Sequence, residues 1–115
     1  MATLNQGKWT GEFLLSEGNG DISREQVTIA AASPAMVPGT VLGKITASGK
    51  YAPYSNANVD GTQTAVGILY AACPDSASDQ KAVMIARFAE VAQAELTGYD
   101  APAGVELAAI GIIVR

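Results

Sequence analysis

The stretch SPAMVPGTVLGKITASGKYAPY, residues 33–54, constrains the fold more than any other part of the chain. Pro34 and Pro38 each restrict the backbone torsion φ, and the glycine after the second proline permits a turn. A short apolar run, residues 41–45, is then separated from residues 51–54 by a turn that contains glycine. The segment therefore predicts a bend followed by a tight antiparallel hairpin, which is a scaffold and not a centre of chemistry.

Length and side-chain size indicate one domain with a modest core. The chain has 115 residues, which suits a single domain, and 49% of them are apolar. Much of that share is alanine, and only two Phe and one Trp are present. Because small side chains bury little area, we expect partner subunits to contribute to burial.

The charge balance and the absence of targeting signals exclude several classes of partner. Seven Lys and Arg oppose eleven Asp and Glu, for a net charge of −4, without a basic cluster that would neutralise phosphates. Direct binding to nucleic acid is therefore not expected. The first residues lack the pattern of a signal peptide, and no apolar run reaches the roughly 18 residues of a membrane span. We expect a soluble protein, made in a cytoplasm, without a membrane partner.

Strand patterns dominate the rest of the chain. Residues 26–30 alternate polar and apolar side chains, and residues 65–72 form a short continuous apolar run. A turn cluster, residues 56–61, lies between the predicted hairpin and that run. Residues 81–96 are ambiguous. Their Ala, Met, Glu and Leu favour a helix, whereas their β-branched residues and flanking turns suit two strands with an irregularity near Ala89.

The C-terminal segment predicts one short helix followed by a strand. Asp100 is suited to cap a helix over residues 101–110, with proline in its first turn. Gly111 ends the helix, and residues 112–114 form a last strand. Together these patterns predict a mostly β fold with one short C-terminal helix in a small single domain.

Residues that could carry chemistry are sparse. The chain has no histidine, which removes the commonest general base and metal ligand. Its single cysteine, Cys73, excludes an internal disulfide and is interpreted as a buried apolar side chain. We expect Arg87 and Arg115 to pair with a carboxylate or with a neighbouring subunit. The acidic residues considered for a carboxylate-only hydrolase are Asp60, Asp75, Asp79, Glu90, Glu95, Asp100 and Glu106.

These acidic residues are interpreted as surface charge, because nearly all fall in predicted turns or on strand faces. They do not form a dense oxygen-ligand motif of the kind that binds calcium. The sequence thus predicts no catalytic residue, no metal site, no cofactor and no small-molecule substrate.

The N-terminal segment, residues 1–22, differs from the rest in being rich in glycine and polar residues around an apolar island of Trp9 and residues 13–15. Such a segment buries too little to offset its ordering entropy, which predicts a flexible arm on a compact domain, residues 23–115. Two hypotheses remain open for the apolar island. It packs back onto the core of its own domain, or it docks on another chain by adding to an exposed strand edge.

Several stretches, in order, resemble the head decoration proteins of tailed bacteriophages, the family of the lambda decoration protein D. None of them is diagnostic by itself, but their order and spacing cover nearly the whole chain. They are residues 11–17, 23–28, 38–46, 49–51, 65–70 and 107–115.

The resemblance implies a β-clip domain that forms a homotrimer on the outer surface of the expanded phage head. There it would bind the major capsid protein and stabilise the shell against the pressure of packaged DNA. It also favours the strand interpretation of residues 81–96, and it gives the N-terminal arm the role of binding the capsid. The arm residues expected to contact the shell are Trp9, Glu12, Phe13, Leu14 and Leu15.

Two other functions are compatible with the same sequence features. The first is a β-rich subunit, unrelated to virions, that docks on a larger complex through the same arm. The second is the carboxylate-dependent hydrolase, which ranks well below both. On the arm hypothesis, removal of residues 1–22 is expected to leave a folded trimer that no longer binds heads.

Overall fold

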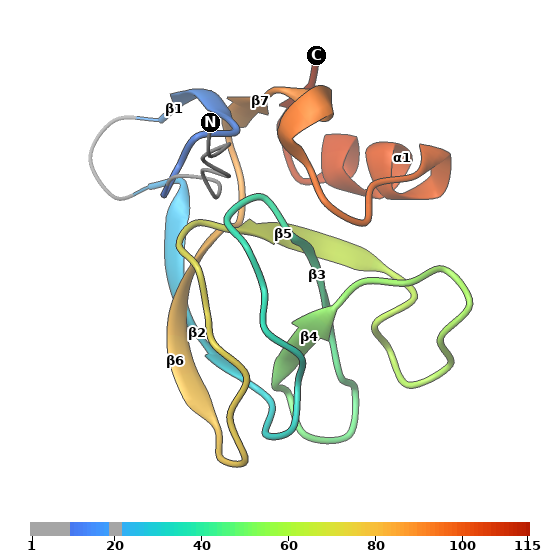
Figure 1. Cartoon of the computed structure of the whole chain (residues 1–115). Helices are drawn as coiled ribbons and strands as arrows, with labels where there is room; N and C mark the ends of the chain where they lie inside the picture. Colours follow the sequence, from blue (N-terminus) through green and yellow to red (C-terminus); the bar gives the residue numbers. More distant parts are fainter. Residues whose placement is uncertain (1–9, 19–21) are drawn as a thin grey trace, which may run out of the picture.

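Five strands close into a small β-barrel in the computed structural model, which describes residues 10–18 and 22–115 (Figure 1). The strand order is β2-β4-β3-β5-β6, and β6 pairs again with β2 to complete the circle. Neighbours are antiparallel except β2 and β4, which run parallel where Ile29 lies beside Tyr51. The barrel strands are β2 (Arg24–Ile29), β3 (Val41–Lys44), β4 (Tyr51–Pro53), β5 (Ala65–Leu69) and β6 (Gln80–Ile85).

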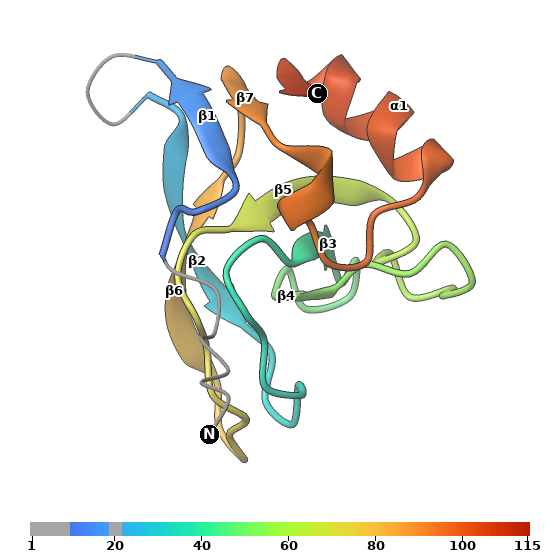
Figure 2. The same cartoon turned by 45° about the horizontal axis from the view of Figure 1, so that its top comes forward.

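A second group of elements covers one end of the barrel (Figures 1 and 2). It consists of a three-stranded sheet in the order β1-β7-β8 and the helix α1, and we call it the end layer. Strand β1 is antiparallel to β7, and β8 is parallel to it. The elements are β1 (Leu14–Glu17), β7 (Ala89–Val91), α1 (Ala101–Ala109) and β8 (Ile112–Val114), with a 3-10 turn at Gln93–Glu95 between β7 and α1.

This architecture confirms the predicted fold class, a mostly β single domain with one short helix near the C-terminus. None of the helical segments in the described ranges has the length and apolar character needed to cross a membrane.

The predicted hairpin is present as β3 and β4. Leu42 lies opposite Pro53 and Lys44 opposite Tyr51, and the connecting turn closes with a 2.8 Å hydrogen bond from the Gly49 N–H to the Ile45 carbonyl. Gly49 has φ +72°, a conformation that L side chains rarely adopt. The glycine that the sequence places in this turn is therefore required by its geometry.

Residues 81–91 hold most of β6 and all of β7, and residues 93–95 form the 3-10 turn, so the prediction of one continuous helix over residues 81–96 is wrong. Strand β6 ends at Ile85 and β7 begins at Ala89, so the break falls where the sequence predicted an irregularity. Phe88 has φ +50° in this break, which turns the chain from the barrel into the sheet of the end layer. Strand pairing outweighs the helix propensity of these residues, because β6 completes the barrel by pairing with both β2 and β5.

Helix α1 begins as predicted and ends at Ala109, one residue before the predicted end. The Asp100 carboxylate accepts a 2.9 Å hydrogen bond from the Ala103 N–H, which satisfies one of the unpaired donors of the first turn. Pro102 occupies that turn, and Gly111 follows the helix with φ +85°. Asp100 also accepts a 2.8 Å hydrogen bond from the Tyr54 hydroxyl, so the cap fastens α1 to the residue after β4.

Two apolar clusters make up the core, and three barrel strands contribute to both of them. Successive side chains of a strand point to opposite faces, so a strand with a continuous apolar sequence can serve two clusters. The cluster shared with the end layer contains Val41, Ile68 and Ile85. The cluster of the barrel contains Leu42, Leu69 and Met84.

The boundary expected for the N-terminal arm requires a correction. Of the segment 1–22, residues 14–17 form β1 in the end layer, and Phe13 is only 1% exposed in the shared cluster. The compact body therefore begins before residue 23. The sequence was too sparse in apolar groups to indicate this locally, and the missing contacts come from β7 and the barrel, far along the chain.

Candidate functional site

The segment expected to bind a partner is built into the edge of the end layer. Leu14 lies opposite Val91 and Ser16 opposite Glu90, with a register shift between the two pairs. Strand addition was the predicted binding mode, and it occurs here with β7 of the same chain. Of the two hypotheses for the apolar island, packing onto its own domain is correct for Phe13.

The five predicted contact residues have different environments in the structure. Phe13 is buried, and Leu14 is partly buried against the same cluster. Glu12 is exposed in the turn before β1, and Leu15 is 55% exposed. Trp9 lies outside the described residues. The capsid-binding role of the set stays a prediction, and within it Glu12 and Leu15 have the accessible side chains.

An ionic contact fastens the end of β1 to the barrel. Arg24, at the start of β2, donates two hydrogen bonds to the Glu17 carboxylate, at 2.7 and 3.1 Å. The guanidinium also lies 4.2 Å from the centre of the Tyr70 ring, a cation–π contact. The hydrogen bond to Glu17 raises the pKa of Arg24 above its usual value. Tyr70 in turn accepts a 2.9 Å hydrogen bond at its carbonyl from the Gly11 N–H.

A polar row crosses the outer face of the three-stranded sheet. The Ser16 hydroxyl donates to the Glu90 carboxylate at 2.9 Å, and Arg115 pairs with the other carboxylate oxygen of Glu90. Ser16 first and Arg115 second lower the pKa of Glu90. The row thus joins β1, β7 and the C-terminal residue, and it confirms that Arg115 pairs with a carboxylate, as Arg87 does with Glu25 at 3.0 Å.

Large apolar side chains are exposed around this row and along α1. Five of the seven exposed large apolar residues in the described ranges lie in the end layer or at its connections to the barrel. Isolated exposed apolar side chains are ordinary, but a concentration at one end indicates an interaction surface. The five residues are Leu15, Ile22, Phe88, Val105 and Ile113.

Sequence reasoning identified Leu15 but missed the other four. Phe88 and Ile113 had been assigned only to predicted strands, where alternation does not reveal which face is exposed. Val105 had a usable signal. Its helix carries Ala, Pro, Gly and Val at most positions, which leaves no polar face to meet solvent.

Most of the carboxylates considered for catalysis are engaged in structural contacts. Asp60 accepts a hydrogen bond from the Thr62 N–H at 3.1 Å, and hydrogen bonds from Thr62 lower the pKa of Asp60. Asp79 pairs with the Lys50 ammonium at 2.6 Å, which lowers its pKa. Glu106 accepts a hydrogen bond from the first N–H of β5 at 3.0 Å. Among the described residues, no three Asp, Glu, Cys or His side chains gather as a metal site would require.

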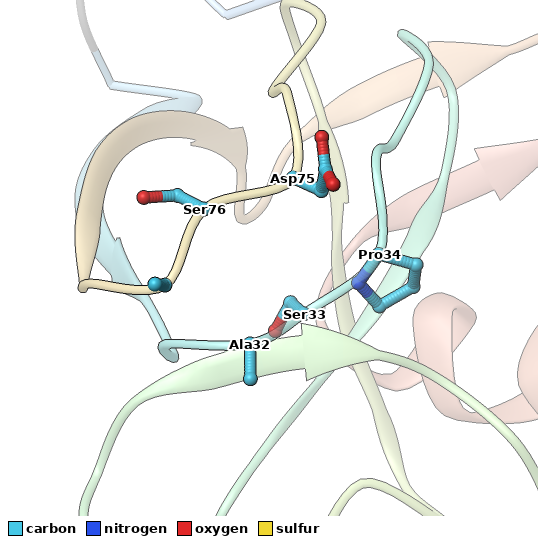
Figure 3. A pocket seen from close by; sticks show the side chains of 6 residues that line it. Ala32, Ser33, Pro34, Asp75 and Ser76 are labelled. Carbon is cyan, nitrogen blue, oxygen red and sulfur yellow. The ribbon is translucent and has the colours of Figure 1, made fainter.

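The hollow that contains Asp75 has no second group for acid–base chemistry (Figure 3). Residues 32–34 and 75–77 line a space of about 450 Å³, and Asp75 is the titratable side chain among them. The other polar side chains labelled in the view are Ser33 and Ser76, and no basic side chain that could deprotonate their hydroxyls lines the hollow. Glycoside hydrolysis needs two carboxyl groups facing each other, so this hollow gives the hydrolase hypothesis no support.

Cys73 is 6% exposed in the barrel cluster, which agrees with its interpretation as a buried apolar side chain. Burial raises the pKa of its thiol, the opposite of what a nucleophile requires.

These features define the class of protein. A closed barrel carries a firmly packed end layer, and that layer displays apolar side chains and strand edges without a catalytic constellation among the described residues. Such a domain is suited to assembly.

The family of bacteriophage lambda head decoration protein D has a model that matches residues 3–112, nearly the whole chain, and the chain belongs to this family. The resemblance deduced from the sequence is confirmed. The family comprises structural proteins of the phage capsid and is not a family of enzymes, so the protein has a capsid decoration role, its partner is the phage head, and its place is the virion. This decides against a subunit unrelated to virions. Comparison with curated proteins found no significant match.

Proposed function

We propose that the protein binds the outer surface of the expanded phage head as a homotrimer and stabilises the shell against the pressure of packaged DNA. The observation that carries the proposal is the family match over residues 3–112. The architecture supports it, because a decoration protein under load needs a stiff body and a firm attachment for the segment that contacts the shell.

Phe13 and β1 are suited to transmit that load. A pull on the residues before Thr10 would reach the barrel through the buried Phe13 side chain and the pairing of β1 with β7. The Glu17–Arg24 contact adds a second attachment at the far end of β1. Three such segments on one trimer would bind the shell at high effective concentration, so weak single contacts would add to a durable attachment.

Within the proposed contact set the residues divide into two roles. Trp9, Glu12 and Leu15 contact the major capsid protein, whereas Phe13 and Leu14 anchor the segment to the body from which it extends. This assignment keeps the five predicted residues and follows their burial in the described part of the chain.

The experiment compares two truncations on purified expanded and unexpanded heads. Removal of residues 1–9 takes away Trp9 but not Glu12 or Leu15, so it should weaken co-sedimentation with expanded heads and leave the unfolding transition of the free protein unchanged. Removal of residues 1–22 should instead destabilise the protein, because it removes Phe13 and β1 from the core. The earlier expectation that the longer truncation leaves a folded domain is therefore replaced.

Wild-type protein should bind expanded heads selectively. Equal binding to both forms of the head, or full binding by the protein that lacks residues 1–9, would contradict the proposed mode of attachment.

A further inference from the structure

Helix α1 has an outer face on which no side chain carries a charge or a hydrogen-bonding group. The exposed residues of the helix are Ala101, Pro102, Val105, Ala108 and Ala109. Its one charged residue, Glu106, accepts a hydrogen bond from the Ala65 N–H of β5 at 3.0 Å. A helix that meets solvent normally presents polar side chains outward, so this face has the composition of a covered surface.

The same face continues into a shallow groove beside β8. The groove has a volume of about 420 Å³ and runs between α1 and the C-terminal strand. Val105 is 73% exposed and Ile113 51% exposed along it. At Gly104 the helix lacks a side chain, and the Tyr99 hydroxyl occupies the space that a Cβ atom would need. The remaining lining residues are Ala101, Ala108, Ile112 and Val114.

Figures 1 and 2 show α1 along the outside of the end layer, with the barrel on its other side. The buried residues of the helix, Ala103 and Leu107, pack in the cluster shared with the barrel. Both faces of α1 are therefore apolar, and its own chain covers only one of them.

The charge of the protein indicates what covers the other face. Copies of a chain with a net charge of −4 repel one another, so they associate most easily where neither copy presents a charge. The outer face of α1 meets that condition. The neighbouring surface around Phe88 does not, because Glu17, Glu90 and Arg115 line it, and Ile113 lies between the two surfaces and lines both.

We propose that α1 and β8 form the surface through which copies of this chain associate. The inference rests on the trimer of the proposed function and assigns its interface, leaving the shell contact to the N-terminal segment. The small side chains of Ala101 and Ala108 allow close approach of a neighbouring copy. Val105 supplies the large apolar contact, and Ile113 lies at the margin, next to the charged surface.

The test uses two matched substitutions, Val105→Glu and Val59→Glu. Val59 is 93% exposed in the loop between β4 and β5, so both changes place the same charge at an accessible valine. Analytical ultracentrifugation should find wild type and Val59→Glu at three times the 11.7 kDa chain mass. Val105→Glu should sediment as a monomer, with a dissociation concentration raised about 100-fold, because each copy would bring a carboxylate into an apolar interface.

A second variant, Ala108→Glu, guards against a local folding defect at position 105. Both α1 variants should keep the wild-type circular dichroism spectrum, since neither side chain belongs to the core. Trimers that persist in both variants would overturn the proposal, and so would a wild type that stays monomeric at millimolar concentration.

Head binding separates this inference from the proposed function. If the wild-type protein is monomeric and still decorates heads, the proposed α1 interface is contradicted and the capsid decoration role stands. A wild-type trimer that Val105→Glu dissociates, but that does not bind heads, would support the interface and contradict the proposed decoration of expanded heads.

Discussion

The barrel and the end layer use strands in different ways. Each barrel strand has neighbours on both sides, so the ring leaves no strand at an edge. In the end layer β1 and β8 are edge strands, and all three strands are only three or four residues long. Of the seven exposed large apolar residues in the described ranges, only Val37 and Val59 lie away from the end layer and its connections.

The difference shows how one small protein can combine a barrel that offers few binding groups with an end layer suited to bind other proteins. The barrel satisfies its own backbone groups and offers neighbours little to bind, whereas the end layer concentrates edges and apolar side chains. The two are not separate modules, because β3, β5 and β6 each send side chains into the cluster that they share. A force applied to the end layer through a contact is therefore transmitted to the whole barrel.

The largest expected effect tests whether the N-terminal part of the end layer belongs to the core. Phe13→Ala should lower the free energy of unfolding by about 3–5 kcal/mol, because it empties a fully buried site. Leu15→Ala, two residues away and 55% exposed, should change it by no more than about 0.5 kcal/mol. Urea unfolding measures both. Equal, small effects would mean that residues 10–18 do not pack on the barrel in solution.

A smaller effect is expected at the fastening between α1 and the barrel. Asp100→Ala removes the helix cap and leaves the buried Tyr54 hydroxyl without its acceptor, for a loss of about 2 kcal/mol or more in the free energy of unfolding. Tyr54→Phe keeps the cap and should cost about 1 kcal/mol. The absorbance titration of tyrosine adds a check, because burial first and then Asp100 raise the pKa of Tyr54 to about 12. If both variants unfold at the same urea concentration, the cap contributes nothing.

The smallest expected effect is the loss of stability at acid pH. The pKa of Glu90 is lowered in the folded state, so its contribution to stability is present above its unfolded pKa and is lost as the pH falls through the folded value. Wild type should therefore lose stability as the pH falls below the ordinary glutamate pKa of about 4.3, and Glu90→Gln should lose less over the same range. Asp79→Asn provides the same comparison at the barrel, because the pKa of Asp79 is also lowered. Urea midpoints at three pH values measure the slopes, and an unchanged slope in Glu90→Gln would exclude Glu90 as a source of acid sensitivity.

Features that depend on a few adjacent residues were predicted from the sequence. The β3–β4 hairpin follows from a glycine that must adopt positive φ, and α1 follows from a cap and a proline within one turn. The break near Ala89 was also visible, although the sequence did not show that β6 and β7 belong to different sheets. Part of the candidate site, Glu12 and Leu15, has the exposure that the arm hypothesis requires.

The amino-acid sequence alone determined the fold class, the turns, the ends of the helix and the family, because each depends on local torsion preferences or on residue order. Only the tertiary structure decided that Phe13 is core, that Glu90 links β1 to Arg115, and that one face of α1 is left uncovered. These outcomes depend on contacts between residues that are far apart along the chain, as Phe13 and β7 are. Local pattern carries no record of such contacts, since the energy that orders residues 10–18 comes almost entirely from the surface they cover.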